Sequence, residues 1–239
     1  MKGVILAGGK GTRLFPLTDP IPKELLPVYD RPMIVHAVQA LIAGGVRDLA
    51  FVVHSTSLKL YQRTLQKFDL ECTIAWFPER KRGGPSRALL LVKEWIGMED
   101  FAVILGDSVF FNQLPALAEK PAPHMFVMRM RPEENDLAKY GQVKVARGKV
   151  VEMVWKPAEV FSDLIQTTVF IFPPDVFARI RAFKERREMH ISDLTLQYVR
   201  ERAMRYSLLP SASYLDCGTV EALFQASARV RAQARQSRV

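Results

Sequence analysis

A short glycine-rich segment near the start of the chain constrains its fold more than any other feature. Residues 6–14 read Leu-Ala-Gly-Gly-Lys-Gly-Thr-Arg-Leu and directly follow Lys2–Leu6, an apolar run that predicts a buried strand. Glycines let the backbone approach a ligand closely and adopt unusual φ values. Successive backbone N–H groups in such a turn can hold phosphate oxygens, and Arg13 adds a planar, permanently charged donor. The segment therefore predicts a phosphate-binding loop in an α/β fold.

Two familiar phosphate-binding motifs do not match this segment. A Walker A loop requires Gly-Lys followed by Ser or Thr, but Gly11 follows Lys10. A dinucleotide fingerprint requires a third glycine three residues after the second, and Leu14 stands at that position. The simpler alternative is a tight strand-to-helix turn that carries a solvent-facing arginine.

Apolar runs alternate with helical patterns through the first half of the chain. The expected strands are Lys2–Leu6, Asp48–His54, Cys72–Phe77 and Phe101–Leu105. The expected helices are Pro32–Ala43, one capped by Ser55 or Ser57, and Ser86–Ile96. Strands that alternate with helices imply a mostly parallel sheet with right-handed crossovers.

The second half has more strand patterns. The expected strands are His124–Met130, Gln142–Ala146, Lys149–Trp155 and Ile165–Phe172, and Arg147-Gly148 indicates a hairpin turn between the second and third. The expected helices follow Pro173-Pro174, cover Leu194–Ala203 with a cap at Ser192 or Asp193, and run from a cap at Thr219 to about Ala234. No linker or repeat separates the halves, so we expect one domain over residues 1–239.

Composition narrows the function classes. The formal net charge is +9, but the basic residues form no stripe with interleaved aromatics, so a nucleic-acid-binding role is not favoured. The sequence shows neither an apolar run of membrane-spanning length nor a signal peptide, so no membrane partner is expected. Cys72 and Cys217 have no metal-ligand spacing, which suggests free thiols and a cytoplasmic location.

The motifs together resemble those of sugar nucleotidyltransferases. Residues 6–14 match the family signature Leu-Ala-Gly-Gly-x-Gly-Thr-Arg-Leu, and residues 22–28, Pro-Lys-Glu-Leu-Leu-Pro-Val, resemble its second motif. Residues 29–34 and 215–219 extend a similarity that is greatest to glucose-1-phosphate thymidylyltransferases. The resemblance implies a Rossmann-like three-layer sandwich with a mostly parallel central sheet and a smaller, β-rich, sugar-binding part. The nucleotide-binding half would cover about residues 1–115, and the acceptor-binding half with the C-terminal helix about 116–239.

The sequence places two aspartates where a metal could bind. Asp107 closes the fourth expected strand, and such a strand end faces the ligand crevice of a parallel sheet. Asp216 stands before the last helix. Two carboxylates that act with substrate phosphates and water suit Mg²⁺, although a turn or capping role is the alternative for either aspartate alone. The resemblance implies that both bind Mg²⁺.

The resemblance also assigns roles to other residues. Arg13, Lys23 and Asp107 would be catalytic. Lys156, Trp155 and Thr168 would contact the acceptor. The nucleotide would be bound by Leu6, Ala7, Gly8, Gly9, Gly11, Thr12, Arg13, Gly84 and Arg87.

Four positions depart from the thymidylyltransferase pattern. Arg87 replaces a glutamine that reads the pyrimidine base, and arginine offers donors only. Trp155 replaces a glutamate that faces sugar hydroxyls, and Thr168 replaces a glycine that admits the sugar. His190 replaces a glutamate. These changes favour an altered choice of base and acceptor, with neutral divergence as the alternative.

The sequence therefore predicts Mg²⁺-dependent transfer of a nucleotidyl group from a nucleoside triphosphate, dTTP or UTP-like, to a sugar 1-phosphate, with release of pyrophosphate. One alternative is a nucleotidyltransferase for a phosphorylated acceptor that is not an ordinary hexose. Another is a non-catalytic sensor of nucleotides or nucleotide sugars. The oligomeric state, a homo-oligomer included, stays open.

Overall fold

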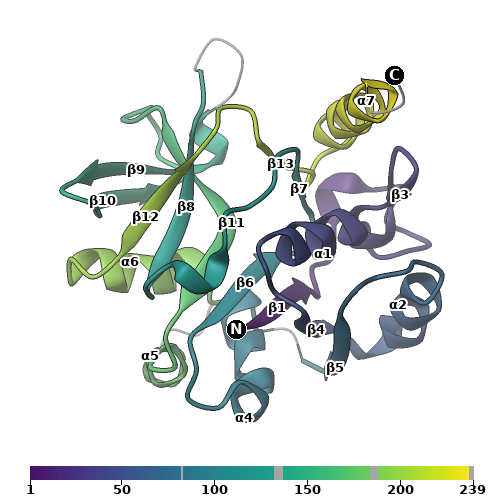
Figure 1. The fold of residues 1–239 in the computed structure, drawn as a ribbon, viewed down its shortest axis with the longest axis horizontal. Coiled ribbons are helices and arrows are strands. Elements are labelled where there is room, and N and C mark those ends of the chain that lie inside the picture. Colours follow the sequence, from purple (N-terminus) through teal and green to yellow (C-terminus); the bar gives the residue numbers. More distant parts are fainter. Residues whose placement is uncertain (82, 132–136, 184–187, 237–239) are drawn as a thin grey trace.

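The fold is built on one nine-stranded sheet, shown in Figure 1. The computed structural model describes residues 1–81, 83–131, 137–183 and 188–236. The strand order is β5-β4-β1-β6-β11-β8-β12-β10-β9. These strands are β1 Lys2–Ala7, β4 Asp48–His54, β5 Thr73–Glu79, β6 Phe101–Leu105, β8 His124–Arg129, β9 Gly141–Ala146, β10 Lys149–Trp155, β11 Leu164–Phe172 and β12 Arg205–Leu209.

The sheet is parallel at one end and mixed at the other. Strand β1 pairs in parallel with β4 and β6, and β4 pairs in parallel with β5, as the alternating pattern predicts. Strand β11 then runs antiparallel to β6 and β8, and the β9–β10 hairpin is antiparallel. At its turn, Arg147 and Gly148 both have positive φ values, of 50° and 75°, as tight hairpin turns require.

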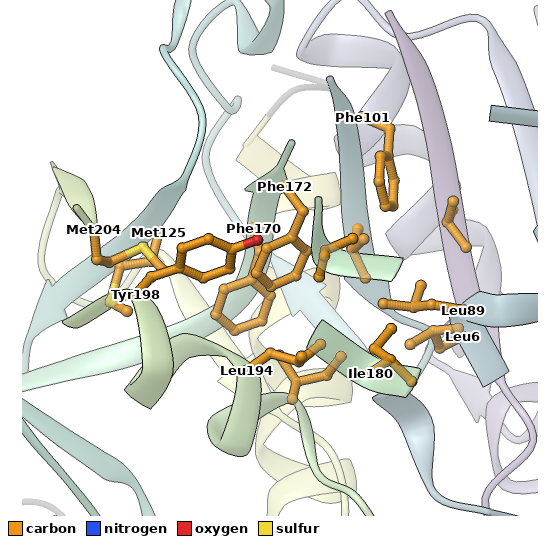
Figure 2. Close-up of a cluster of buried hydrophobic side chains, with 14 of the residues drawn as sticks. Leu6, Leu89, Phe101, Met125, Phe170, Phe172, Ile180, Leu194, Tyr198 and Met204 are labelled. Carbon is orange, nitrogen blue, oxygen red and sulfur yellow. The ribbon is translucent and has the colours of Figure 1, made fainter. Parts of the chain in front are cut away.

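Helices cover both faces of the sheet, which gives three layers. Neighbouring residues of β1 point to opposite faces, so Ile5 belongs to one core cluster and Leu6 to the other. Helices α1 (Met33–Ala43) and α2 (Leu58–Leu65) contribute to the first cluster. Helices α5 (Val176–Ala182) and α6 (Ile191–Arg200) contribute to the second, whose aromatic side chains Figure 2 shows.

The expected helix over Ser86–Ile96 is divided into three pieces. They are α3 (Pro85–Ala88), a 3₁₀ turn over Leu89–Val92, and α4 (Lys93–Ile96). Residues three apart on a 3₁₀ turn share a face. Leu89 and Val92 both have fully buried side chains, so the tighter winding directs both toward the core.

The predicted start and end of α6 are wrong. Neither Ser192 nor Asp193 precedes the helix, because His190 occupies the cap position and its backbone N–H donates to Asp193 Oδ2 at 2.7 Å. Asp193 thus closes the first turn from inside the helix. The helix stops before Ala203, because Arg202 adopts a left-handed conformation with a φ of 56°.

Two smaller sheets and the last helix complete the fold. Strands β2 (Pro27–Val28) and β3 (Arg31–Pro32) form one pair, and β7 (Ser108–Phe110) and β13 (Tyr214–Asp216) form the other. Helix α7 (Val220–Gln236) packs beside them, at the yellow end of the chain in Figure 1. Thr219 caps this helix as predicted, because its Oγ1 accepts from the Ala222 backbone N–H at 3.2 Å. No helix in the described part of the chain has the length and apolar character needed to cross a membrane.

We expect Phe172→Ala to destabilise the fold strongly. Phe172 is fully buried and its ring lies near those of Phe170, Phe101 and Tyr198, so truncation leaves a cavity. Such changes cost about 3–5 kcal/mol of unfolding free energy. Phe224→Ala is the matched control, because Phe224 is 74% exposed. Chemical denaturation of both variants checks the prediction, and equal losses would contradict it.

Candidate active site

A cavity of about 450 Å³ opens at the carboxyl ends of the parallel strands. Leu6, Val52, Glu79 and Leu105 line it from β1, β4, β5 and β6, respectively. Ligands of open α/β sheets bind at such strand ends. The structure brings most of the predicted nucleotide and catalytic residues to this cavity: Leu6, Gly8, Gly9, Gly11, Thr12, Arg13, Lys23, Gly84 and Asp107.

The glycine loop leaves room for the side chain of Lys23. A Cβ on Gly9 would lie 2.9 Å from Lys23 Cε, and a Cβ on Gly11 would lie 3.0 Å from Lys23 Cβ. Gly11 also has a φ of 67°, and the hydroxyl of Thr18 donates to its carbonyl oxygen at 2.9 Å. The glycines therefore allow Lys23 to pass close to the loop and reach the cavity.

Lys23 and Asp107 form an ion pair in the cavity, with 2.5 Å between Nζ and Oδ2. Burial lowers the pKa of Lys23, but the charges of Asp107 and Glu24 outweigh burial and raise it above its usual value. Burial raises the pKa of Asp107, but the charge and hydrogen bond of Lys23 outweigh burial and lower it. Both groups are therefore charged at neutral pH.

Strand pairing brings Asp216 to Asp107 from far along the chain. In the β7–β13 pair Asp216 lies opposite Ser108, and the Cys217 backbone N–H donates to the carbonyl oxygen of Asp107 at 3.0 Å. Burial and then the charge of Asp107 raise the pKa of Asp216 to about 6. A Cβ on Gly218 would lie 2.6 Å from Arg13 Nη2 and 2.9 Å from Asp216 Oδ1, so Arg13 approaches the pair here.

These two carboxylates fit the requirements of Mg²⁺. The repulsion that raises the pKa of Asp216 is the kind of repulsion that a divalent cation relieves. Mg²⁺ is typically held by one or two carboxylates together with phosphate oxygens and water. In the described part of the chain, no group of three or more His, Cys, Asp and Glu side chains could hold a metal ion. A metal held by Asp107 and Asp216 would take its remaining ligands from phosphate oxygens and water.

The buried carboxyl group of Glu24 lies close to the ammonium group of Lys23. Glu24 is 1% exposed, and its Oε1 lies 3.9 Å from Lys23 Nζ. Tyr61 donates to Glu24 Oε2 at 2.8 Å, and its hydroxyl also lies 3.0 Å from the carbonyl oxygen of Ala7. Burial raises the pKa of Glu24, although Lys23 opposes this effect. The Tyr61 hydroxyl thus joins α2 to the end of β1 and to the Lys23 segment.

The part of the cavity wall at Gly84 depends on a close backbone contact. Gly84 has a φ of 88°, and a Cβ there would lie 2.6 Å from the carbonyl oxygen of Met189. The neighbouring Ser86 is tied to the same segment, because its backbone N–H donates to the Met189 carbonyl at 3.1 Å and its hydroxyl to the His190 carbonyl at 2.7 Å. His190 lines the cavity from this wall.

Some predicted residues lie elsewhere. Ala7 lines a neighbouring cavity on the other side of the loop. Arg87 is on α3 but is not among the residues that line the main cavity, where Ala88 lies instead. Arg87 packs toward Gly83, at 3.0 Å from the position of a Cβ there. A role of Arg87 at the base stays a prediction.

The three predicted acceptor residues lie on β10 and β11 and in the segment after β10. Trp155 is 40% exposed, and Lys156 Nζ lies 5.2 Å from the centre of its indole ring. Lys156 has a φ of 49°, a conformation that costs a non-glycine residue of the order of 1 kcal/mol and often marks a functional site. Thr168 is buried, and its hydroxyl lies 2.5 Å from the hydroxyl of Ser108, beside Asp107.

Sequence reasoning missed several residues of the cavity. Glu24 stands inside the second motif, and its burial in the fold could not be read from its charge. Glu79 ends β5, two residues beyond the predicted end of that strand, and its Oε2 would lie 2.8 Å from a Cβ on Gly8. The other lining residues outside the predicted set are Lys10, Val52, Pro85, Ala88, Leu105, Glu188, His190 and Gly218.

Comparisons with known proteins agree with this geometry. Residues 2–233 match the model of the nucleotidyl transferase family. The glucose-1-phosphate thymidylyltransferase of Neisseria meningitidis serogroup A is 30% identical over 242 residues, which cover 97% of this chain and 83% of that protein. The enzyme of the same name from an Actinoplanes species is 30% identical over 244 residues, 97% of this chain and 78% of that protein. The chain belongs to the nucleotidyl transferase family, and it is a nucleotidyltransferase.

Solved structures support the same fold. A Bacillus anthracis protein solved in complex with sucrose superposes with a TM-score of 0.86 at 29% identity, over 97% of this chain and 95% of that one. A UDP-glucose pyrophosphorylase in complex with UDP-glucose has a TM-score of 0.82 at 24% identity, over 97% and 98% of the two chains. At that identity the second likeness concerns the fold alone. The Rossmann-like three-layer architecture is confirmed.

We expect Gly84→Ala to disturb the cavity wall. The added Cβ collides with backbone atoms of Met189, and the φ of 88° disfavours any side chain. Gly45→Ala is the matched control, because Gly45 has a φ of 84° with nothing within 4 Å of its added Cβ. We expect Gly84→Ala to lower the free energy of unfolding by about 1–3 kcal/mol more than the control does, and to weaken triphosphate binding. Thermal unfolding and nucleotide titration measure both effects, and equal behaviour of the two variants would argue against the contact.

Proposed function

We propose that this nucleotidyltransferase transfers a nucleotidyl group from a nucleoside triphosphate, dTTP or UTP-like, to a sugar 1-phosphate, with Mg²⁺ as cofactor and pyrophosphate as second product. The observation that carries the proposal is the convergence of Arg13, Lys23, Asp107 and Asp216 beside the glycine loop. Arg13, Lys23 and Asp107 line the cavity, and Asp216 lies next to it, where its Oδ1 accepts from the backbone N–H of the lining residue Gly218. Two cations and two carboxylates in this arrangement suit a highly charged phosphate substrate and a divalent metal.

The cavity suits a nucleotide in shape and chemistry. Its glycine loop presents backbone at one side, where phosphate oxygens can bind. Leu6, Val52 and Ala88 supply an apolar surface on the same face of the sheet, suitable for a flat base. We therefore propose that the base lies toward Gly84 and Ala88, and the triphosphate lies toward Gly9, Gly11 and Arg13.

The chemistry is a direct displacement. A phosphate oxygen of the sugar 1-phosphate attacks the α-phosphorus of the triphosphate, and the bond to the bridging oxygen of the departing pyrophosphate breaks. The attacking oxygen is already anionic, so no general base is required. Lys23 would hold the reacting phosphates, and Arg13 would offset charge on the pyrophosphate. Bound through Asp107 and Asp216, Mg²⁺ would neutralise charge near the α-phosphate.

The proposed acceptor site differs from the family pattern. Trp155 presents an apolar ring where the pattern has a carboxylate, and Thr168 adds a side chain where it has glycine. Lys156 would bind the sugar phosphate, and its ammonium group beside the indole ring is consistent with this role. We propose that acceptor choice has changed with these residues. We also place the enzyme in the cytoplasm, consistent with the free thiols of Cys72 and Cys217.

The two other functions from the sequence make different predictions. A non-hexose phosphorylated acceptor would use the same charged cluster but give no turnover with sugar 1-phosphates. A non-catalytic sensor would bind nucleotide without release of pyrophosphate. The Lys23–Asp107 pair is compatible with both catalysis and binding, so the measurement that separates the two is pyrophosphate release.

We expect Asp107→Asn to remove most Mg²⁺-dependent turnover while the protein stays folded. The amide keeps the shape of the side chain and can still accept from Lys23, but it loses the charge that would hold the metal. The expected fall in kcat is about 10²–10³-fold. Asp100→Asn, at the opposite end of β6, is the control. Pyrophosphate release with and without EDTA, together with circular dichroism, tests this, and near wild-type kcat at saturating Mg²⁺ would refute the metal role.

We expect glucose 1-phosphate with dTTP not to be the best substrate pair. Trp155 removes a carboxylate that could accept from sugar hydroxyls, and an altered set of buried polar partners can change discrimination by orders of magnitude. The measurement is kcat/KM across triphosphates and phosphorylated sugars. If glucose 1-phosphate and dTTP give the highest value by a wide margin, the substitutions at Trp155, Thr168 and Arg87 are neutral divergence.

A further inference from the structure

Gln166 of β11 carries a buried polar atom with no protein partner. The residue is 7% exposed, and its Oε1 makes no hydrogen bond within the described residues. A buried amide oxygen without a partner costs about 1–3 kcal/mol, so its presence in a fold requires a reason. The same absence of a partner leaves the carboxamide able to turn about its last torsion without breaking a bond at this oxygen.

Strand register places Gln166 on the face of the sheet that carries the cavity. Gln166 lies opposite Val127 in the β11–β8 pair, and residues opposite each other in an antiparallel pair point to the same side. Val127 belongs to the core cluster that also contains Leu6 and Val52, two residues that line the cavity. Gln166 is thus on the active-site side.

The carboxamide lies beside the indole of Trp155. Gly141 and Trp155 are opposite each other in the β9–β10 pair. A Cβ on Gly141 would lie 3.0 Å from both Cγ and Cδ of Gln166, and 3.0 Å from Cε3 of Trp155. Gly141 therefore provides the space in which an amide and an aromatic ring from two different strands meet.

The same strand connects this amide to the catalytic aspartate. Thr168 follows Gln166 by two positions on β11, and its hydroxyl lies 2.5 Å from that of Ser108, the residue after Asp107. Gln166 and Trp155 therefore lie on the part of β11 and β10 next to the proposed metal site, where the acceptor is proposed to bind. Gln166 belongs to no motif, because it is a single glutamine within an apolar strand, so its sequence context does not single it out.

We propose that Gln166 is a specificity-determining residue for the acceptor, and that its carboxamide hydrogen-bonds a hydroxyl of the sugar while Trp155 packs against a less polar edge of the same ring. This inference rests on the proposed function. A hydroxyl can donate and accept, so it can pair with either end of the amide. The acceptor class is then a neutral sugar 1-phosphate with a hydroxyl at one edge and a deoxygenated or otherwise apolar edge opposite.

The test uses Gln166→Leu in the full chain, with Gln166→Met as a second variant of similar length. The control is Gln39→Leu, an exposed glutamine of α1 that contacts Arg31. Each protein is assayed for kcat/KM with glucose 1-phosphate, its monodeoxy analogues and N-acetylglucosamine 1-phosphate, at saturating triphosphate and Mg²⁺. Thermal unfolding and the KM for triphosphate are measured in parallel.

We expect the Gln166 variants to keep or raise the melting temperature, because an unpaired polar group is removed, and to keep the KM for triphosphate. We expect kcat/KM for the preferred acceptor to fall about tenfold or more, and the fall to vanish for the analogue that lacks the paired hydroxyl. If both variants rank the acceptors as the wild type does, the role of Gln166 in acceptor choice is overturned, while the proposed function stands. Absence of pyrophosphate release by the wild-type protein with every pair would overturn the proposed function and this inference with it.

Discussion

The ion pair between Lys23 and Asp107 is the interaction around which the active site is arranged. It joins a lysine that follows the glycine loop to an aspartate at the end of a central strand, across 84 positions of sequence. The pair closes only because Gly9 and Gly11 leave room for the lysine side chain. The second carboxylate is brought to Asp107 by the backbone, since the Cys217 N–H donates to the carbonyl oxygen of Asp107 and Asp216 pairs with Ser108.

The charges of this cavity compensate one another in the free protein. Lys23 opposes Asp107, and Asp216 gains its charge only as the pH rises through about 6. Buried Glu24 has a raised pKa and accepts from Tyr61. Buried ion pairs contribute little net stability and are expensive to break on one side. A divalent metal and a substrate with several phosphate charges can replace these internal partners. The charged cluster therefore adds little to stability but suits binding.

The sequence predicts the parts of this structure that depend on neighbours in the chain. Eight strands of the main sheet, the hairpin turn at Arg147-Gly148, the cap at Thr219 and the glycine loop follow from local pattern. Strand β12 of the main sheet and the short strands β2, β3, β7 and β13 are not predicted. The sequence does not predict that Ala88 lines the cavity where Arg87 does not, because on so short a helix as α3 a single position decides which side chain faces inward. The start of α6 also differs from the prediction, because one residue suits two positions at a helix start. Asp193 suits either a cap or a first-turn position, and His190 is not a usual cap.

Contacts between distant segments account for the residues that sequence reasoning missed. Buried Glu24 accepts from Tyr61 of α2, and Gln166 and Trp155 both approach the space that Gly141 leaves open. The proposed nucleotide side of the site is built mainly from contiguous motifs, whereas the proposed acceptor side is built from single residues on β9, β10 and β11. A substitution on the acceptor side can therefore alter specificity without disturbing the phosphate loop. The hydrogen bond between Thr168 and Ser108 links the two sides, so a bulky apolar residue at position 168 would disturb Asp107 as well as contact the sugar.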